Sequence, residues 1–233
     1  MERSLSTIKT RFRCKSILVI SFVLICSLTS TAQSRWNAIT VGLANPTGAF
    51  YQNNLTLPFD KAVGAKPGWY TSFEGAFYFK ESGKLNLGLS YMVSLASNGT
   101  NWDKWVSGST SYTGKAITSM ELKVGLIATY LVSGDLQIDG FVRLGDNLAW
   151  GGSGKWTTSA GTTNFSATGF GAGYGANLGV NARFHRLLGT FQYKTGSVTK
   201  KYSLDSPAGF NTTSYKMPIS SFYLGIGFLI SSH

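Results

Sequence analysis

Residues 85–95, LNLGLSYMVSL, have two chemically different faces, and the rest of the chain repeats that difference. Side chains alternate across a β-strand, so one face here is large and apolar and the other is small or polar. The wet face of a soluble strand usually carries Lys, Glu and Thr, whereas Gly, Ser and Asn suit a crowded interior. The length also matches the roughly 9–11 residues that a tilted strand needs to cross a bilayer. The stretch therefore predicts a strand with lipid on one side and a tight polar interior on the other.

The same alternation recurs in seven further segments. We expect these strands at residues 36–44, 69–80, 119–131, 136–145, 171–184, 187–195 and 221–230. The connections alternate strictly between long polar stretches and short turns at 81–84, 132–135 and 185–186. An even number of strands with this alternation places all short turns at one end, as in outer-membrane barrels. The pattern predicts an all-β fold, an eight-stranded antiparallel up-and-down transmembrane β-barrel.

The competing fold is a soluble eight-stranded calyx of the lipocalin kind, in which the apolar face points inward to a ligand. The Gly, Ser and Asn face would then be the outer surface. Glycine is a weak residue for an exposed strand, and this face carries few charges for solubility. The composition of the two faces therefore favours the membrane barrel.

The N-terminal segment indicates export. Residues 1–15 carry five Lys or Arg against one Glu, residues 16–28 are mostly apolar, and Ser30-Thr31-Ala32 supplies small residues before a cleavage point. This order is typical of a secretory signal peptide, and the apolar run is too short to span a membrane comfortably as a helix. We expect residues 1–32 to be removed and residues 33–233 to form one barrel domain, with both termini in the periplasm.

The remaining chain is basic and lacks cysteine. Subtracting the five basic and one acidic residue of the signal from 21 Lys and Arg and 10 Asp and Glu leaves 16 against 9. No basic run longer than Lys200-Lys201 remains, so the sequence gives no support for nucleic-acid binding. Cys14 and Cys26 both lie in the signal, so disulfides cannot stabilise the domain.

The whole chain after the signal resembles the small eight-stranded outer-membrane β-barrel family, which includes OmpA-like and OmpX-like barrels. The resemblance is one of pattern and topology, and the last strand, FYLGIGFLI, resembles the family's terminal assembly signal. That signal usually ends on an aromatic residue, whereas here Phe228 is followed by five further residues. The resemblance implies a Gram-negative outer membrane, contact with lipid including lipopolysaccharide, and insertion by the barrel-assembly machinery.

Charged residues occupy inward positions on three of the expected strands. Buried charges must be paired, and pairing across the turn at 132–135 is expected to bring Glu121 and Lys123 near Arg143. An eight-stranded barrel is only wide enough to hold its own side chains. We therefore interpret these residues as a structural ion network that fills the lumen, with a gated polar path as the alternative. The network consists of Glu74, Glu121, Lys123, Asp139 and Arg143.

The long loops carry four tryptophans, which are either anchors of a binding surface or members of an interfacial aromatic belt. They are Trp102, Trp105, Trp150 and Trp156. A partner at this surface would be a protein, a glycan or a neighbouring subunit. The segment GGSGKW at 151–156 fails the phosphate-loop pattern at Ala149 and Trp156, and we expect a flexible external loop there.

Two function classes remain open. The leading one is a non-enzymatic, cell-surface barrel with a filled lumen that acts as a structural, adhesive or complex-forming component through its external loops. The alternatives are a barrel enzyme that modifies lipid A or phospholipid acyl chains, and a narrow pore or small-ligand-binding barrel. The sequence offers no catalytic set, because His185 lies alone in a turn. It also predicts neither a cofactor nor a metal, since His185 and His233 make no ligand set.

Overall fold

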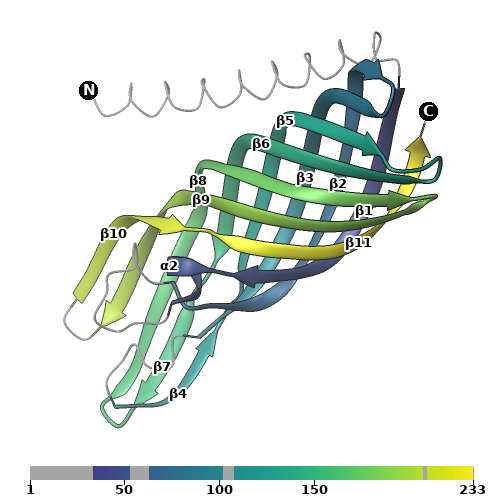
Figure 1. Ribbon diagram of the computed structural model, residues 1–233. Helices are drawn as coiled ribbons and strands as arrows, with labels where there is room; N and C mark the ends of the chain where they lie inside the picture. The colour runs from purple at the N-terminus through teal and green to yellow at the C-terminus, as the bar shows by residue number, and fades with distance from the viewer. Residues whose placement is uncertain (1–33, 53–62, 102–107, 207–208, 233) are drawn as a thin grey trace, which may run out of the picture.

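The computed structural model describes residues 34–52, 63–101, 108–206 and 209–232, and these residues form a closed ring of strands. Each ring strand pairs antiparallel with its neighbour in the chain, and β1 pairs with β11 from Pro46↔Ser221 to Trp36↔Ser232. This last pairing closes the barrel (Figure 1). The ring strands are β1 (Ser34–Pro46), β2 (Ala65–Ser82), β3 (Leu85–Thr100), β5 (Ile117–Leu131), β6 (Leu136–Gly151), β8 (Gly161–Phe184), β9 (Leu187–Ser206) and β11 (Ser221–Ser232).

The prediction of an eight-stranded, antiparallel, up-and-down barrel is confirmed. The three short turns lie at one end, which we call the turn end, together with the start of β1 and the end of β11 (Figure 1). The long connections lie at the opposite end, which we call the loop end. Among the described residues, no helix is both long enough and apolar enough to cross a membrane. The predicted signal at residues 1–32 lies outside the described residues.

The long connections contain more structure than the sequence pattern predicts. They hold a short helix, α2 (Gly48–Tyr51), and three additional strands, β4 (Ser109–Gly114), β7 (Gly154–Thr158) and β10 (Gly209–Pro218). The prediction of a flexible loop at 151–156 is wrong, because β7 pairs with both β4 and β8. The outer halves of β8 and β9 extend beyond the ring, and β7 and β10 satisfy backbone groups that would otherwise be unpaired. Together these segments form a loop-end sheet in the order β4-β7-β8-β9-β10.

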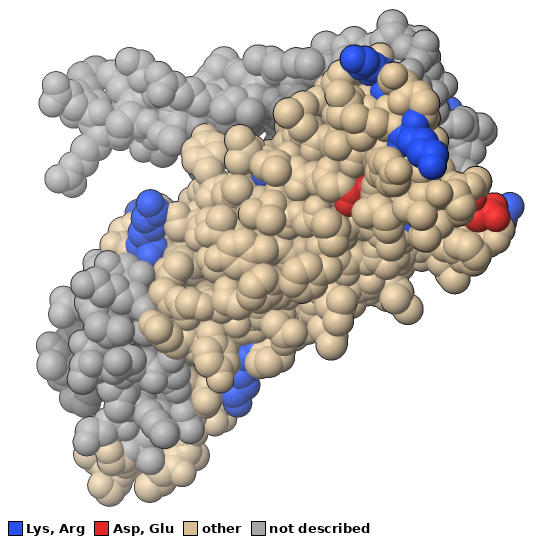
Figure 2. Space-filling view, viewed as in Figure 1, with Lys and Arg blue, Asp and Glu red and all other residues tan. Residues whose placement is uncertain are grey.

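The outer surface of the ring is apolar. Leu126 is 65% exposed, Leu144 62% and Ile226 74%, and each lies at an outward position in the middle of its strand. Most of the face seen in Figure 2 carries no charged side chain, and the Lys and Arg side chains in this view lie mainly toward the two ends. The inward face is small or polar, as the alternation of residues 85–95 predicts. An apolar belt thus surrounds a polar interior.

Glycines allow a large aromatic side chain to fit inside this narrow ring. The buried ring of Tyr70 stacks on Tyr223, with 4.3 Å between ring centroids. A Cβ added at Gly42 would lie 2.7 Å from the Tyr70 ring and 2.1 Å from the Leu224 carbonyl oxygen. A Cβ at Gly225 would lie 2.2 Å from the Tyr70 hydroxyl. The absence of side chains at these two positions is therefore what admits the tyrosine pair.

We predict that Gly42→Ala destabilises the barrel, because the added methyl overlaps backbone atoms that cannot move independently. Overpacking of this kind costs about 1–3 kcal/mol in the free energy of unfolding. The matched control is Gly140→Ala on β6, where an added Cβ meets nothing within 4 Å. Denaturant unfolding in detergent micelles measures both variants. Equal stability of the two variants would contradict the packing role assigned to Gly42.

Candidate functional site

Three ion pairs lie inside the lumen within the part of the chain that the structure describes. Arg143 contacts Glu74 at 3.0 Å, Arg183 contacts Asp139 at 2.8 Å, and Lys194 contacts Glu121. All six side chains are at most 6% exposed. Glu74 and Arg143 lie on β2 and β6, which are not neighbours in the sheet, so this pair crosses the lumen. Glu121 and Lys194, on β5 and β9, also cross it. Asp139 and Arg183 lie on the neighbouring strands β6 and β8, so this pair lies along one wall.

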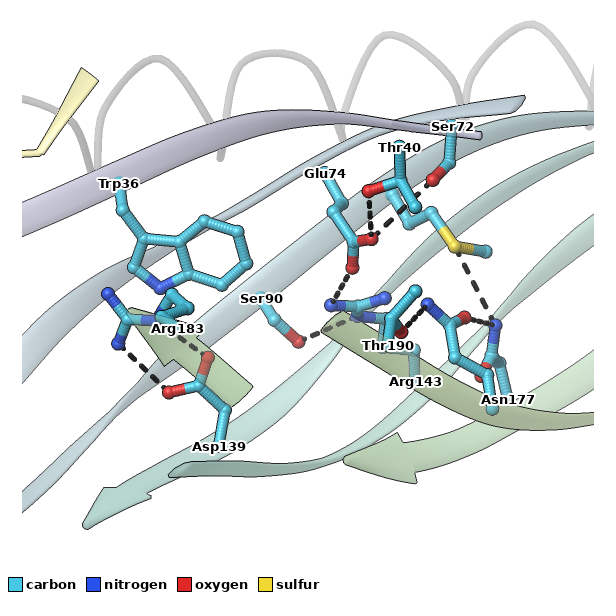
Figure 3. A network of polar contacts seen from close by, with 12 residues as sticks. Trp36, Thr40, Ser72, Glu74, Ser90, Asp139, Arg143, Asn177, Arg183 and Thr190 are labelled. Atoms are coloured by element: carbon cyan, nitrogen blue, oxygen red, sulfur yellow. Dashed lines mark hydrogen bonds and ion pairs between the residues drawn. The ribbon is translucent and has the colours of Figure 1, made fainter. Parts of the chain in front are cut away.

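The Glu74–Arg143 pair lies in the middle of the barrel. Arg143 Nη2 donates to Glu74 Oε2 at 3.0 Å, and Arg143 Nε donates to Ser90 Oγ at 3.0 Å. Thr40 Oγ1 donates to Glu74 Oε1 at 3.2 Å, and the guanidinium lies 3.8 Å from the centroid of the Phe141 ring. Figure 3 shows the side chains of Thr40, Glu74, Ser90 and Arg143 converging from different strands. The carboxylate and the guanidinium thus retain polar partners despite complete burial.

The Asp139–Arg183 pair lies nearer the turn end. Arg183 donates to both carboxylate oxygens of Asp139, at 2.8 and 2.9 Å (Figure 3). It also donates to the Tyr78 hydroxyl at 2.8 Å. Thr129 Oγ1 donates to Asp139 Oδ1 at 2.6 Å. Trp36 Nε1 donates to the Tyr78 hydroxyl at 3.0 Å, and the Trp36 ring lies 4.8 Å from the guanidinium. A bidentate ion pair and aromatic side chains fill this part of the lumen.

The Glu121–Lys194 pair lies nearer the loop end. Lys194 Nζ also donates to Tyr223 Oη at 3.1 Å, and the Tyr223 hydroxyl donates to Glu121 Oε1 at 3.1 Å. Lys123, on the same strand as Glu121, donates to Asn147 Oδ1 at 2.8 Å and to the Gly145 carbonyl at 3.2 Å. This ammonium group is therefore bound by neutral oxygens.

The five residues expected to line the lumen all lie inside it, but one predicted contact is wrong. Glu121 and Lys123 do not pair with Arg143, because the register of β5 and β6 places Arg143 opposite Gly125 and Glu121 opposite Asn147. Sequence reasoning also left Arg183 and Lys194 out of the network. Both occupy inward positions in the alternation of their strands, so counting inward cations against inward carboxylates would have found them.

A hydrophobic cluster covers the loop end of the lumen. It joins α2, β7, β10 and the outer parts of the ring strands, and we call it the cap cluster. Beside it, Lys200 donates to the Gly151 carbonyl, and burial lowers the pKa of Lys200 to about 8. The cap cluster consists of Phe50, Val63, Ala65, Ile117, Ala149, Trp156, Phe165, Val198, Met217 and Ile219. The lumen is therefore bounded by packed apolar side chains rather than by an open mouth.

The predicted tryptophan surface needs correction. Trp156 is 2% exposed and packs against Tyr112 and Phe165, so it belongs to the cap cluster and is not available to a partner. Trp150 is half-buried and contacts the Phe170 ring at 5.6 Å between centroids, on the outer wall. Trp102 and Trp105 lie outside the described residues. The sequence predicts that Trp156 lies in an exposed loop, but it lies in β7, where successive side chains alternate, so that Trp156 points inward while Lys155 is exposed.

His185 lies in the turn between β8 and β9 with a positive φ of 52°. Its Nδ1 is 3.6 Å from Asp135 Oδ1, and both side chains are more than 60% exposed. No group of three or more His, Cys, Asp or Glu side chains in the described segments is placed to hold a metal ion. The turn therefore presents one solvent-exposed contact, at the far end of the barrel from the cap cluster.

No protein-family profile matches the sequence, and no curated protein matches it. Several solved structures are similar in fold. Ail, the attachment invasion locus protein of Yersinia pestis, is 8% identical, with 84% of this chain and 98% of Ail covered and a TM-score of 0.41. OprG from Pseudomonas aeruginosa is 13% identical, with coverages of 86% and 97% and a TM-score of 0.45. A major outer membrane protein from Thermus thermophilus is 12% identical, with coverages of 84% and 99% and a TM-score of 0.44. The closed ring of paired strands, rather than these likenesses, establishes the barrel.

We predict that Arg143→Ala destabilises the barrel strongly, because it leaves the Glu74 carboxylate buried without a cation. Breaking a buried pair costs about 3–5 kcal/mol in unfolding free energy, whereas Lys155→Ala on the exposed face of β7 should cost little. The double variant Glu74→Gln with Arg143→Met should be more stable than Arg143→Ala alone. Thermal unfolding in micelles measures all three. An Arg143→Ala variant as stable as Lys155→Ala would refute the role of the ion pair.

Proposed function

We propose that the protein is a non-enzymatic outer-membrane barrel with a sealed lumen, which acts as a structural, adhesive or complex-forming component through its loop end. The observation that carries the proposal is the apolar belt around a closed ring. Residues of the belt such as Leu126 and Ile226 are more than 60% exposed, and water would disfavour so large an exposed apolar surface. A bilayer removes that cost.

Closure of the sheet supports insertion in a membrane. In hydrocarbon each unsatisfied backbone group costs several kcal/mol, so a spanning sheet must have no free edge. The ring meets this requirement through the β1–β11 pairing. The predicted export signal and the even strand count favour the outer membrane of a Gram-negative cell, with the short turns in the periplasm and the loop end outside.

The contents of the lumen support a non-conducting barrel over the narrow-pore alternative. Ion pairs occupy the interior at three levels, two of them connect opposite walls, and the cap cluster closes the loop end. An ion crossing the barrel would have to displace several buried, mutually bonded side chains. The charged lumen is therefore better suited to holding the walls together than to conduction.

The loop-end sheet supports a role in external contacts. Its inner side packs on the cap cluster, so its strands are held in place rather than free to move independently. Its outer side carries exposed polar residues, among them Lys155, Lys201 and Lys216 on three different strands. A firmly held polar surface with three cations suits a partner that is acidic, either a protein or an anionic glycan.

We predict that the purified protein shows no steady conductance in planar lipid bilayers, because the ion pairs and the cap cluster occupy the path. The measurement uses single-channel recording at several voltages, with detergent alone as the control. A stable, ion-selective conductance that Glu121→Gln or Arg143→Ala alters would show that the network is a pathway, and the sealed-barrel proposal would be wrong.

A further inference from the structure

A groove of about 410 Å³ runs along the outer wall of the barrel across β1, β2, β3 and β5. It forms because Thr71 is a short side chain at an outward position between Trp69 and Phe73. The Thr71 hydroxyl donates to the Thr40 carbonyl at 3.1 Å, so it offers no free polar group to the groove. The outward residues that line the groove are Ile39, Thr71, Phe73, Val93, Leu95 and Met120. The groove is therefore an apolar depression in the outer surface of the belt.

Two exposed lysines lie beyond the groove toward the loop end. The Lys66 side chain lies over Gly99, where an added Cβ would be 3.7 Å from Lys66 Cβ. Lys115 is adjacent, because the Thr100 hydroxyl donates to its carbonyl at 3.4 Å. Asn98 Nδ2 donates to the Lys66 carbonyl at 2.9 Å, which fixes the backbone at this corner. Both lysines, whose side chains are exposed, thus lie in the same sector of the wall as the groove.

The groove and the lysines lie at different heights along the barrel axis, and this difference suits a lipid whose acyl chain lies in the hydrocarbon core and whose phosphate lies in the headgroup region. Leu95, at the loop-end side of the groove, and Gly99 lie four residues apart on the same outward face of β3. Four residues extend about 13 Å along a strand, or about 10 Å in height at the usual tilt of a membrane barrel. The headgroup region begins where the hydrocarbon core ends and is roughly 5–8 Å thick on each side of a bilayer. An acyl chain in the groove would therefore place its phosphate near Lys66 and Lys115.

We propose that this sector is a binding site for lipid A, with one acyl chain in the groove and a phosphate at Lys66 and Lys115. The inference rests on the proposed outer-membrane orientation, since the loop end then faces the leaflet that contains lipopolysaccharide. The groove supplies apolar contact and the lysines supply charge complementary to phosphate. Lys80 and Lys84 are also exposed, but they lie at the turn end, which faces the opposite leaflet in this orientation.

Native mass spectrometry of the full-length barrel in detergent, titrated with purified lipid A, tests the site. Wild-type protein should retain one lipid A molecule. Thr71→Trp should fill the groove and reduce retention, whereas Ala128→Trp, at an outward position nearer the turn end, should not. The double variant Lys66→Gln with Lys115→Gln should weaken binding about thirtyfold, and Lys80→Gln with Lys84→Gln should leave it unchanged.

Three outcomes would overturn the site. The first is that the Thr71→Trp variant and the double variant Lys66→Gln with Lys115→Gln both retain lipid A as the wild type does. The second is that the wild type retains phosphatidylcholine as well as it retains lipid A. The third is that it retains phosphatidylglycerol in preference to lipid A. The different migration of boiled and unboiled protein on a denaturing gel verifies that each variant is a folded barrel. Failure of lipid binding in a folded, membrane-located barrel would refute this site alone, whereas recovery as a soluble species would refute the proposed function.

Discussion

The closing of the sheet by β1 and β11 is the constraint on which the rest of the structure depends. Backbone groups in hydrocarbon need hydrogen-bond partners, and a ring provides them without leaving an edge. Closing eight strands leaves an interior just wide enough for side chains. That narrowness requires glycine at positions such as Gly42 and Gly225, so that a buried Tyr70 can fit. The inward positions therefore combine small residues with a few large ones such as Tyr70, whereas the outward positions carry large apolar residues.

A narrow polar interior must also neutralise its own charges. Three ion pairs do so, two of them across the lumen and one between neighbouring strands, and each carboxylate receives further hydrogen bonds from hydroxyl groups. Such pairs contribute little net stability compared with apolar packing, but removing one partner is costly. The two pairs that cross the lumen therefore specify how opposite walls face each other. The cap cluster completes the closure with apolar side chains from the loop end, where the ring no longer has lipid around it.

The ring could be predicted from the sequence because membrane strands alternate on a strict period of two. Residues 85–95 illustrate this, and all of them lie within β3. Partners within the lumen could not be predicted in the same way. Arg143 binds Glu74 across the barrel, and that contact depends on tilt and register rather than on neighbouring strands. Counting inward charges would have identified Lys194 as a member of the network, but not Glu121 as its partner.

The strands of the loop end escaped prediction for a different reason. Their sequences are polar and rich in Gly, Ser and Thr, which is also typical of loops. Only the alternation of Gly154, Lys155 and Trp156 hints at β7, and it is too short to decide. Pairing with the extended β8 and β9 determines their structure. Burial of Trp156 follows from that pairing and removes this tryptophan from the proposed contact surface.

The central claim is that the apolar belt faces lipid chains, and site-directed spin labelling tests it most directly. Cys14 and Cys26 are the only cysteines of the sequence, so replacing both with Ser makes one cysteine introduced into the ring a unique label. Labels at Leu126 and Ile226, in protein reconstituted in lipid vesicles, should be relaxed strongly by oxygen and weakly by a water-soluble nickel complex. A label at Lys155 should show the reverse. Strong relaxation by the nickel complex at Leu126 and Ile226 would contradict the account.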